Sequence, residues 1–244
     1  YIEIHNLTMA YGDFIIQRDL NFTISRGDVF IIMGGSGCGK STLMKHLIGL
    51  KPPASGDIII DGMNYWKAQP HEQEALKQRF GVMFQAGALW SSLTLAENIA
   101  LPLGEYTKLS DKQIAEVVSL KLALVGLSGF EEFYPSQISG GMRKRASLAR
   151  AIALDPEIVF FDEPSAGLDP ISSRRLDNLI LELSNSLRMT VVIVTHELAS
   201  IFAIGNNSVF LDADTKTMLT TGDPNMLRND ISNPKVKNFL NRGE

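Results

Sequence analysis

The sequence has a single cysteine, Cys38, and no long apolar run. One cysteine excludes an intramolecular disulfide, which fits a reducing compartment. The longest uncharged stretch, 80–96, is interrupted by polar residues and glycine, so we expect no helix that spans a membrane. The first residues, Tyr1-Ile-Glu-Ile, lack the basic-then-apolar pattern of a leader, so we expect no signal peptide. These absences predict a soluble chain whose membrane role, if any, goes through a partner.

An excess of positive charge is also missing. The formal net charge is −4 and the sequence pI is about 5.6, which argues against a nucleic-acid partner held by bulk charge. The 244 residues, 45% of them hydrophobic, suffice for a full core in one large or two small domains.

The central motif is a glycine-rich loop in a strand–loop–helix context. It follows the apolar run 28–33 and precedes the helical pattern 42–49, and it reads Gly34-Gly35-Ser36-Gly37-Cys38-Gly39-Lys40-Ser41-Thr42. This is the arrangement of a phosphate-binding P-loop, whose backbone N–H groups surround a β-phosphate. Lys40 is expected to reach the β- and γ-phosphates, and Ser41 to ligate Mg²⁺.

Cys38 lies at the start of the helix that follows this loop, where the thiolate form is favoured. One hypothesis is therefore that alkylation of Cys38 blocks ATP binding and that ATP protects the thiol. The alternative is an inert loop residue that tolerates replacement.

The N-terminal region is predicted to form short strands at 1–4, 14–16, 20–24 and 29–32. Tyr11 lies between them, and it could either pack on a sheet or stack on an adenine ring. The sequence leaves both roles open.

The middle of the chain predicts a strand at 57–61, a polar helix at 71–79 and a strand that ends at Gln85, which could sense Mg²⁺ or water. From 94 to about 127 the pattern is helical, with an interruption predicted at Pro102 to Gly104. Two capping boxes mark helix starts in this region: Thr94 with Glu97, and Ser110 with Gln113.

Ser139-Gly140-Gly141 precedes a predicted helix at 142–154. The group could be an ordinary N-cap, but beside a P-loop it could supply a second phosphate-contacting helix terminus. The basic run 143–145 could be a solvated helix face.

A buried strand at 157–161 ends in Asp162 and Glu163. Adjacent carboxylates at a strand tip repel unless a cation is near, so Asp162 is predicted to hold Mg²⁺ and Glu163 to polarise an attacking water. A strand at 190–195 ends at His196, which could donate to a γ-phosphate. Helix 171–187 separates these strands, and a hairpin is predicted from 208–211 and 217–219.

Over residues 1–222 the ordered motifs resemble the ATP-binding subunit of ABC transporters. Tyr11 matches the A-loop, Gly34 to Thr42 Walker A, Gln85 the Q-loop, Ser139-Gly140-Gly141 the signature, Ile158 to Glu163 Walker B, Leu168-Asp169 the D-loop and His196 the H-loop. The resemblance implies an α/β P-loop NTPase with a RecA-like core, an antiparallel β portion and an inserted helical lobe near 86–155. It also implies a head-to-tail dimer that binds ATP and Mg²⁺ between the P-loop of one copy and the signature of the other, with Asp169 near the shared site.

One signature position departs from the family pattern, because Met142 stands where glutamine is usual. Methionine cannot make the polar contacts of glutamine. The hydrolytic positions are all filled, so an active ATPase is expected.

Finer motifs resemble the Mla-type, MCE-associated lipid-transport ATPases. They are Ser139 to Arg145, Phe84 to Asn98, Thr195 to Phe202 and a short C-terminal extension, 223–244. This resemblance implies a subunit on the cytoplasmic face of a bacterial inner membrane, with transmembrane permease subunits, a periplasmic MCE-domain protein and a phospholipid or related lipid as cargo. A groove near 84–92 would then drive a cytoplasmic helix of the permease.

Two alternatives stay open at this point. One is the ATPase of an importer for amino acids or another small solute. The other is a non-transport ABC ATPase that uses ATP as a conformational switch.

Overall fold

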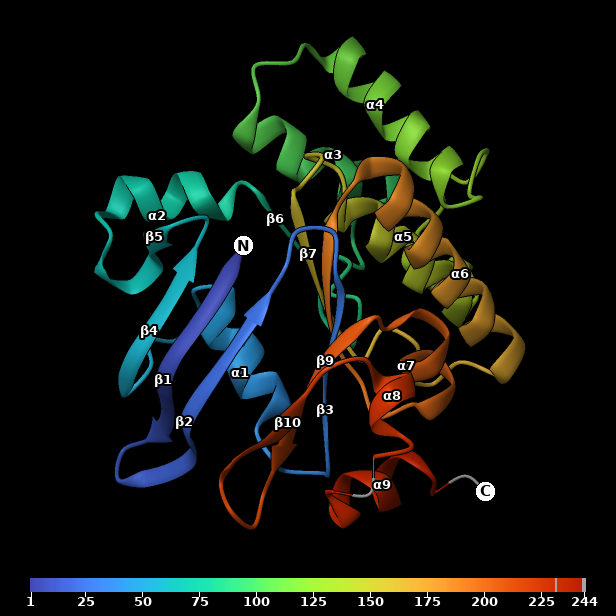
Figure 1. Ribbon diagram of the computed structural model, residues 1–244. Helices are drawn as coiled ribbons and strands as arrows, with labels where there is room; N and C mark the ends of the chain where they lie inside the picture. Colours follow the sequence, from blue (N-terminus) through green and yellow to red (C-terminus); the bar gives the residue numbers. More distant parts are fainter. Residues whose placement is uncertain (231, 243–244) are drawn as a thin grey trace.

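The computed structural model describes residues 1–230 and 232–242, whose strands form two sheets (Figure 1). The first has the order β2-β1-β4-β5 and contains β1 (Ile2–Tyr11), β2 (Phe14–Ile24), β4 (Ser55–Ile60) and β5 (Met63–Asn64). The second has the order β10-β9-β3-β8-β7-β6 and contains β3 (Val29–Gly34), β6 (Phe80–Met83), β7 (Ile158–Asp162), β8 (Thr190–Val194), β9 (Asn207–Asp212) and β10 (Thr217–Thr221).

The helices connect and cover these strands. They are α1 (Lys40–Leu47), α2 (Pro70–Lys77), α3 (Leu95–Tyr106), α4 (Asp111–Leu124), α5 (Gly140–Ala151), α6 (Pro170–Leu187), α7 (Leu198–Ile204), α8 (Pro224–Leu227) and α9 (Pro234–Leu240), with short 3₁₀ turns at Tyr65–Lys67 and Pro135–Gln137. None of the helices in the described ranges is long and apolar enough to cross a membrane.

The larger sheet is parallel except for its edge strand β10. Every residue of β3 and of β8 is buried, which explains their uninterrupted apolar sequences. Since Ile32 of β3 pairs with Val194 of β8, and Val194 with Asp162 of β7, the carboxyl ends of all three strands lie at one edge. The P-loop, Asp162-Glu163 and His196 follow these strands, so the topology brings the predicted motifs together.

The smaller, antiparallel sheet corrects one prediction. The two short strands expected within 14–24 are one strand, β2, whose pairing with β1 shifts register along its length. Asp19 has a φ of +53°, and the irregularity there bends the strand without ending it. The two sheets meet where the rings of Phe22 and Phe30 stack with centroids 5.5 Å apart.

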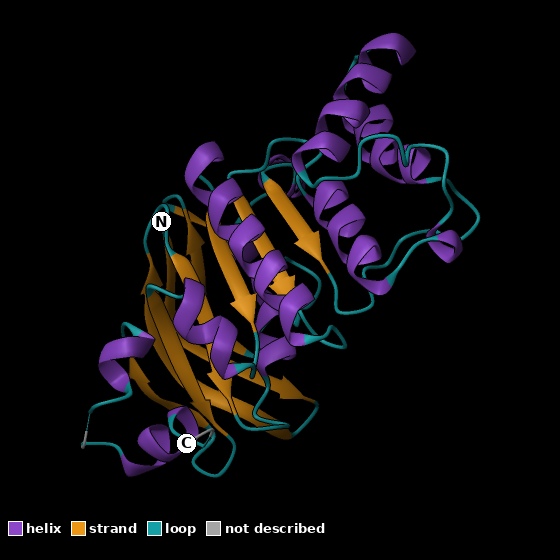
Figure 2. Ribbon diagram, turned by 90° about the vertical axis from the view of Figure 1, so that its right-hand side faces the viewer, coloured by secondary structure: helices purple, strands orange, loops and turns teal. Residues whose placement is uncertain are grey.

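Helices α3, α4 and α5 lie between β6 and β7 in the chain, and α4 lies at the end of the molecule opposite α9 (Figure 1). In Figure 2 these helices extend away from the strands. Both predicted capping boxes are present. The predicted interruption at Pro102 to Gly104 is wrong, because α3 continues through Pro102 to Tyr106. Leu95, Ile99 and Leu103 are all buried on one side of α3, and this burial outweighs the local cost of an interior proline.

The terminal hairpin is confirmed as β9 and β10. Helices α7, α8 and α9 were not predicted, although Asp223 before Pro224 and Asn233 before Pro234 are N-cap and proline signals that start α8 and α9. The fold as a whole matches the expected α/β architecture with an antiparallel portion.

Candidate functional site

The loop between β3 and α1 needs glycine at positions where backbone and side chains approach closely. Gly34 has a φ of +146°, and a Cβ there would lie 2.3 Å from the carbonyl oxygen of Leu211. Gly39 has a φ of +99°, and its Cβ would lie 2.6 Å from Ile16. Lys40 Nζ donates to the carbonyl oxygens of Gly34 and Gly35, at 3.0 Å each. The ammonium group is therefore held against the loop, at the N-terminus of α1.

A cavity of about 580 Å³ opens beside this loop and gathers side chains from distant parts of the chain. Most of the residues predicted for nucleotide binding and hydrolysis line it: Gly34, Ser36, Gly37, Gly39, Lys40, Ser41, Thr42, Gln85, Glu163 and His196. Phe14, Ile16 and Arg242 complete the lining. The size is that of a small-molecule site.

Glu163 and His196 form a pair in this cavity. His196 Nδ1 lies 2.7 Å from Glu163 Oε1, and Glu163 is 8% exposed. The second carboxylate oxygen, Oε2, is buried without a hydrogen bond to the described residues, which is costly unless the atom has a functional partner. Glu163 also has a φ of +49°, a conformation that is uncommon outside glycine and is found at functional sites. The pair has the geometry of a base held by an orienting imidazole.

Ser41, in the first turn of α1, and Asp162, the last residue of β7, supply oxygen atoms next to each other. Ser41 Oγ donates to Asp162 Oδ1 at 3.1 Å. Burial raises the pKa of Asp162 above its ordinary value, while the Ser41 hydrogen bond and nearby lysines oppose that shift. A hydroxyl and a carboxylate in contact, with the amide of Gln85 in the same cavity, fit Mg²⁺, which takes few protein oxygens and completes its shell with water and phosphate.

Lys144 connects the backbones of two predicted site residues, Gln85 and Glu163, and the sequence did not predict this role. Its Nζ donates to the carbonyl oxygen of Gln85 at 2.5 Å and approaches that of Glu163 at 3.5 Å. Arg143 and Arg145 likewise donate to backbone carbonyls. The basic run is therefore not merely a solvated face, because its side chains tie loops together. Only contacts distant in sequence reveal this role.

The thiolate hypothesis for Cys38 is wrong. Cys38 is 1% exposed, and burial raises the pKa of its thiol above the ordinary value. The side chain packs in the core beneath the loop, so the favourable helix terminus is outweighed by desolvation.

Tyr11 lies apart from the cavity lining. Its ring is half exposed, and Lys51 Nζ lies 3.9 Å from the ring centroid. The aromatic ring that lines the cavity is that of Phe14, which is 64% exposed. Tyr11 and Phe14 pair across the turn at Gly12 and Asp13, and the sequence alone does not tell which of the two side chains lines the cavity.

Two signature residues, Ser139 and Gly141, line another cavity, of about 490 Å³, together with Met142. Gly140 instead lines a smaller cavity with Gln85 and Lys144. Ser139 Oγ accepts the N–H of Met142 at 3.2 Å and caps α5. Asp169 caps α6 by accepting the N–H groups of Ile171 and Ser172 at 3.0 Å. The N-termini of α1 and α5 are both suited to bind anions, and they lie at separate cavities of the same chain.

Comparison with known proteins gives a consistent result. The family description "ABC transporter" matches residues 17–166. The chain is 40% identical over 217 residues to "Intermembrane phospholipid transport system ATP-binding protein MlaF" of Haemophilus influenzae, covering 89% of this chain and 82% of that protein. It is 36% identical to the Escherichia coli protein of the same name, covering 98% and 88%.

A mycobacterial relative carries a different name. The chain is 42% identical over 240 residues to "Probable ribonucleotide transport ATP-binding protein mkl" of Mycobacterium tuberculosis. The match covers 98% of this chain but 66% of that protein. The chain thus spans about two thirds of the length of this relative.

A solved ATP-binding cassette, described as dimeric and in a post-hydrolysis state bound to ADP and Pi, superposes with a TM-score of 0.82. The two chains are 28% identical, and the match covers 91% of this chain and 98% of that one. A component of a Clostridium perfringens ABC transporter complex superposes with a TM-score of 0.84 at 25% identity, covering 98% and 94%. On these matches, the chain belongs to the ABC transporter family and has the fold of an ATP-binding cassette.

Proposed function

We propose that this chain hydrolyses ATP to power a transporter that moves phospholipid between membranes. The single observation that carries the ATPase part is the cavity in which the Lys40 loop faces buried Glu163 and its partner, the exposed His196. The names of the Haemophilus influenzae and Escherichia coli relatives support the phospholipid part.

The chain's residues have distinct roles in this proposal. Lys40 and the loop N–H groups bind the phosphates and orient the γ-phosphate. Glu163 accepts a proton from the attacking water, and its contact with His196 fixes the position of the carboxylate. Both groups lie on backbone segments that end buried strands, which keeps their geometry rigid.

Ser41, Asp162 and Gln85 would hold Mg²⁺ with the phosphates. When bound, the ion neutralises charge that develops on the transferred phosphoryl group. Lys144 links the backbones of Gln85 and Glu163, so it would transmit a change at the metal side to the base.

We further propose that two copies assemble head to tail. The separation of the Lys40 cavity from the Ser139 cavity supports this arrangement, because Ser139 could then contact the nucleotide held by the other copy. The dimeric state described for the solved cassette also supports it. Tyr11, Gly35, Cys38 and Asp169 stay predicted contributors to that shared site.

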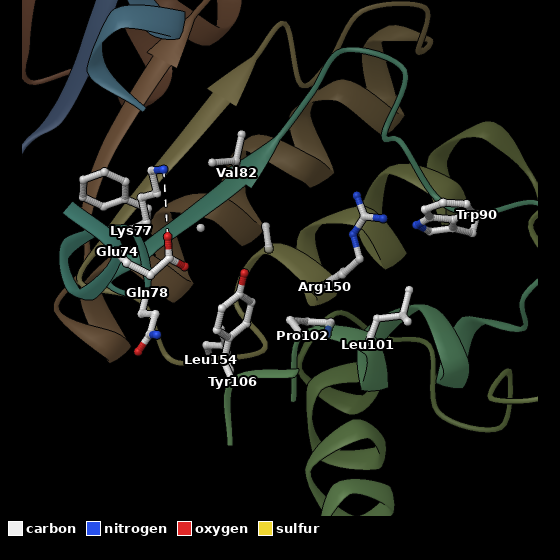
Figure 3. A pocket seen from close by; sticks show the side chains of 13 residues that line it. Glu74, Lys77, Gln78, Val82, Trp90, Leu101, Pro102, Tyr106, Arg150 and Leu154 are labelled. Carbon is white, nitrogen blue, oxygen red and sulfur yellow. Dashed lines mark ion pairs between the residues drawn. The ribbon is translucent and has the colours of Figure 1, made fainter. Parts of the chain in front are cut away.

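A transmembrane permease is the proposed partner for a second surface, shown in Figure 3. A cavity of about 480 Å³ lies between α2, β6, α3 and α5, and its lining includes Trp90, Leu101, Tyr106 and Arg150. The side chains of Trp90, Leu101 and Tyr106 are exposed although they are large and hydrophobic, and Trp90 is 62% exposed. A cytoplasmic helix of the permease would fit here. Of the segment 84–92, only Trp90 lines this cavity.

The remaining expectations complete the proposal. Residues 1–222 would form the ATPase domain with the helical lobe at 86–155, and 223–244 would form an extension, of which 231, 243 and 244 lie outside the described residues. The subunit would work on the cytoplasmic face of a bacterial inner membrane with a periplasmic MCE-domain protein, and without nucleic acid.

Turnover tests the ATPase part. The purified chain should hydrolyse ATP with a dependence on Mg²⁺, and Lys40→Ala should abolish binding or turnover while the protein remains folded. ATPase activity unchanged in Lys40→Ala would contradict the site.

Cargo requires the native complex. The tagged subunit is extracted gently from membranes of its host, and co-purifying proteins and lipids are identified by mass spectrometry. A permease with an MCE-domain protein and phospholipid supports the proposal. A permease with a soluble solute-binding protein indicates an importer, whereas bound ribonucleotide in the permease favours the activity named for the mycobacterial relative. The absence of any membrane partner favours a non-transport switch.

A further inference from the structure

The C-terminal helix α9 is attached to the strand pair that supports the P-loop. Val236 and Leu240 are buried, and the ring of Phe239 meets that of Phe210 edge to face with centroids 5.1 Å apart. Phe210 pairs with Met33 of β3, the residue before the glycine loop. Figure 1 shows α9 at the end of the molecule where β3 turns into α1. Packing of α9 is therefore continuous with the nucleotide site.

Polar contacts reinforce this attachment. Lys235 of α9 forms an ion pair with Asp212 at the end of β9. The backbone oxygen of Asp212 accepts from Gln17 Nε2 at 2.8 Å, and the same amide nitrogen donates to the carbonyl oxygen of Cys38 at 2.8 Å. Gln17 is fully buried. Its side chain therefore links the P-loop to the end of β9, the strand on which α9 packs.

Arg242 extends from the end of α9 into the cavity of the P-loop. Its guanidinium carbon lies 4.3 Å from the ring centroid of Phe239, and its Nη2 donates to the carbonyl oxygen of His196 at 2.5 Å. Arg242 lines the cavity together with Lys40, Ser41 and His196. The aromatic ring thus supports a cation next to the predicted γ-phosphate contact.

The charge of the cavity favours a role for this cation. Among the described residues that line it, the lysine and arginine side chains are those of Lys40 and Arg242, and the carboxylate is that of Glu163. A guanidinium has five N–H donors in a planar fork suited to phosphate. Within the described ranges, the hydrogen bond to His196 occupies one donor group of Arg242, which leaves others for a ligand.

We infer that Arg242 is a further phosphate-binding residue, through which the C-terminal segment contributes to ATP affinity. This inference rests on the proposed nucleotide function. The guanidinium contacts the terminal phosphate from the His196 side, so that it discriminates ATP from ADP. Neither the family match, which ends at residue 166, nor the sequence motifs assign this role.

Equilibrium binding tests the inference on the full chain. MgATP and MgADP are titrated calorimetrically into the wild type, Arg242→Ala, Arg242→Lys and the matched control Lys237→Ala. Lys237 is an exposed basic residue on the same helix and lines none of the cavities around the site. Lys40→Ala serves as the reference for loss of the nucleotide site.

The expected result is a roughly tenfold rise of the ATP Kd in Arg242→Ala, as for loss of one charge-assisted phosphate contact. The ADP Kd rises less, Arg242→Lys recovers part of the affinity, and Lys237→Ala matches the wild type. Raising NaCl to about 0.5 M narrows the difference between Arg242→Ala and the wild type, because salt screens the exposed cation.

Other outcomes overturn the inference. An unchanged ATP Kd in Arg242→Ala shows that the residue does not bind phosphate. Equal losses for ATP and ADP with a lower melting temperature show that it only clamps the His196 loop. Tighter ATP binding in Arg242→Ala shows that the C-terminal segment opposes nucleotide binding. If Lys40→Ala both binds and hydrolyses ATP as the wild type does, the proposed nucleotide function itself fails, which is distinct from a failure confined to Arg242.

Discussion

Replacing Glu163 by glutamine tests the proposed chemistry most directly, since it removes the proposed base and preserves the shape of the side chain. The side chain keeps its length, and its amide oxygen can still accept from His196 Nδ1, now 2.7 Å from Glu163 Oε1. Loss of general-base catalysis lowers turnover by about 10²- to 10⁴-fold. This corresponds to about 3–5 kcal/mol on the activation barrier.

The thermal stability of Glu163→Gln should be equal to or higher than that of the wild type, although its turnover falls. Glu163 is 8% exposed, and its Oε2 has no hydrogen bond to the described residues. A neutral amide loses less free energy on burial than a carboxylate, so the melting temperature of Glu163→Gln should equal or exceed that of the wild type. We therefore expect an inactive protein that is fully folded and that binds ATP.

The assay combines steady-state phosphate release, ATP binding and thermal unfolding. Glu157→Gln is the matched control, because Glu157 immediately precedes the other end of the same strand, β7, and is bound there to Arg79. Glu157→Gln should keep its turnover. Turnover of Glu163→Gln within a few-fold of the wild type would refute the role of Glu163. A lower melting temperature would contradict the stability prediction.

Three further predictions concern reactivity, stability and pH. Cys38 should react slowly with N-ethylmaleimide at pH 7–8 in the folded protein and quickly in denaturant, because it is buried with a raised thiol pKa; fast labelling of the native protein would contradict this. Thr94→Ala should lower the free energy of unfolding by about 1 kcal/mol, since it removes the capping bond to the Glu97 N–H, and urea titration measures the loss. Hydrogen bonds with Arg79 lower the pKa of Glu157 from 4.5 to about 2, so its contribution to stability is present above pH 4.5 and is lost as the pH falls toward 2. Glu157→Gln should therefore flatten the dependence of urea midpoint on pH in that window, and an unchanged slope would contradict the assignment.

Local patterns in the sequence predicted the parts of the site that depend on neighbouring residues. The glycine loop with Lys40, and the carboxylates after a buried strand, are fixed by short-range geometry, and parallel topology then places them together. The comparisons confirm the family assignment that these motifs suggested.

Predictions failed where tertiary contacts outweigh local signals. The thiol of Cys38 follows its burial rather than its helix terminus, and Pro102 is tolerated because α3 buries one face. Lys144 and Arg242 reach the site from 59 and 46 residues away from the backbone groups they bind. Neither contact leaves a periodicity or a motif by which a single sequence could reveal it.

The separation of the Lys40 and Ser139 cavities has a genetic consequence. In the proposed head-to-tail dimer, a Lys40→Ala chain paired with a Ser139→Ala chain carries both lesions in the same composite site. The other site then has an intact loop and an intact signature. Two alleles that are each inactive alone should therefore complement each other when they are expressed together, whereas two Lys40 alleles should not.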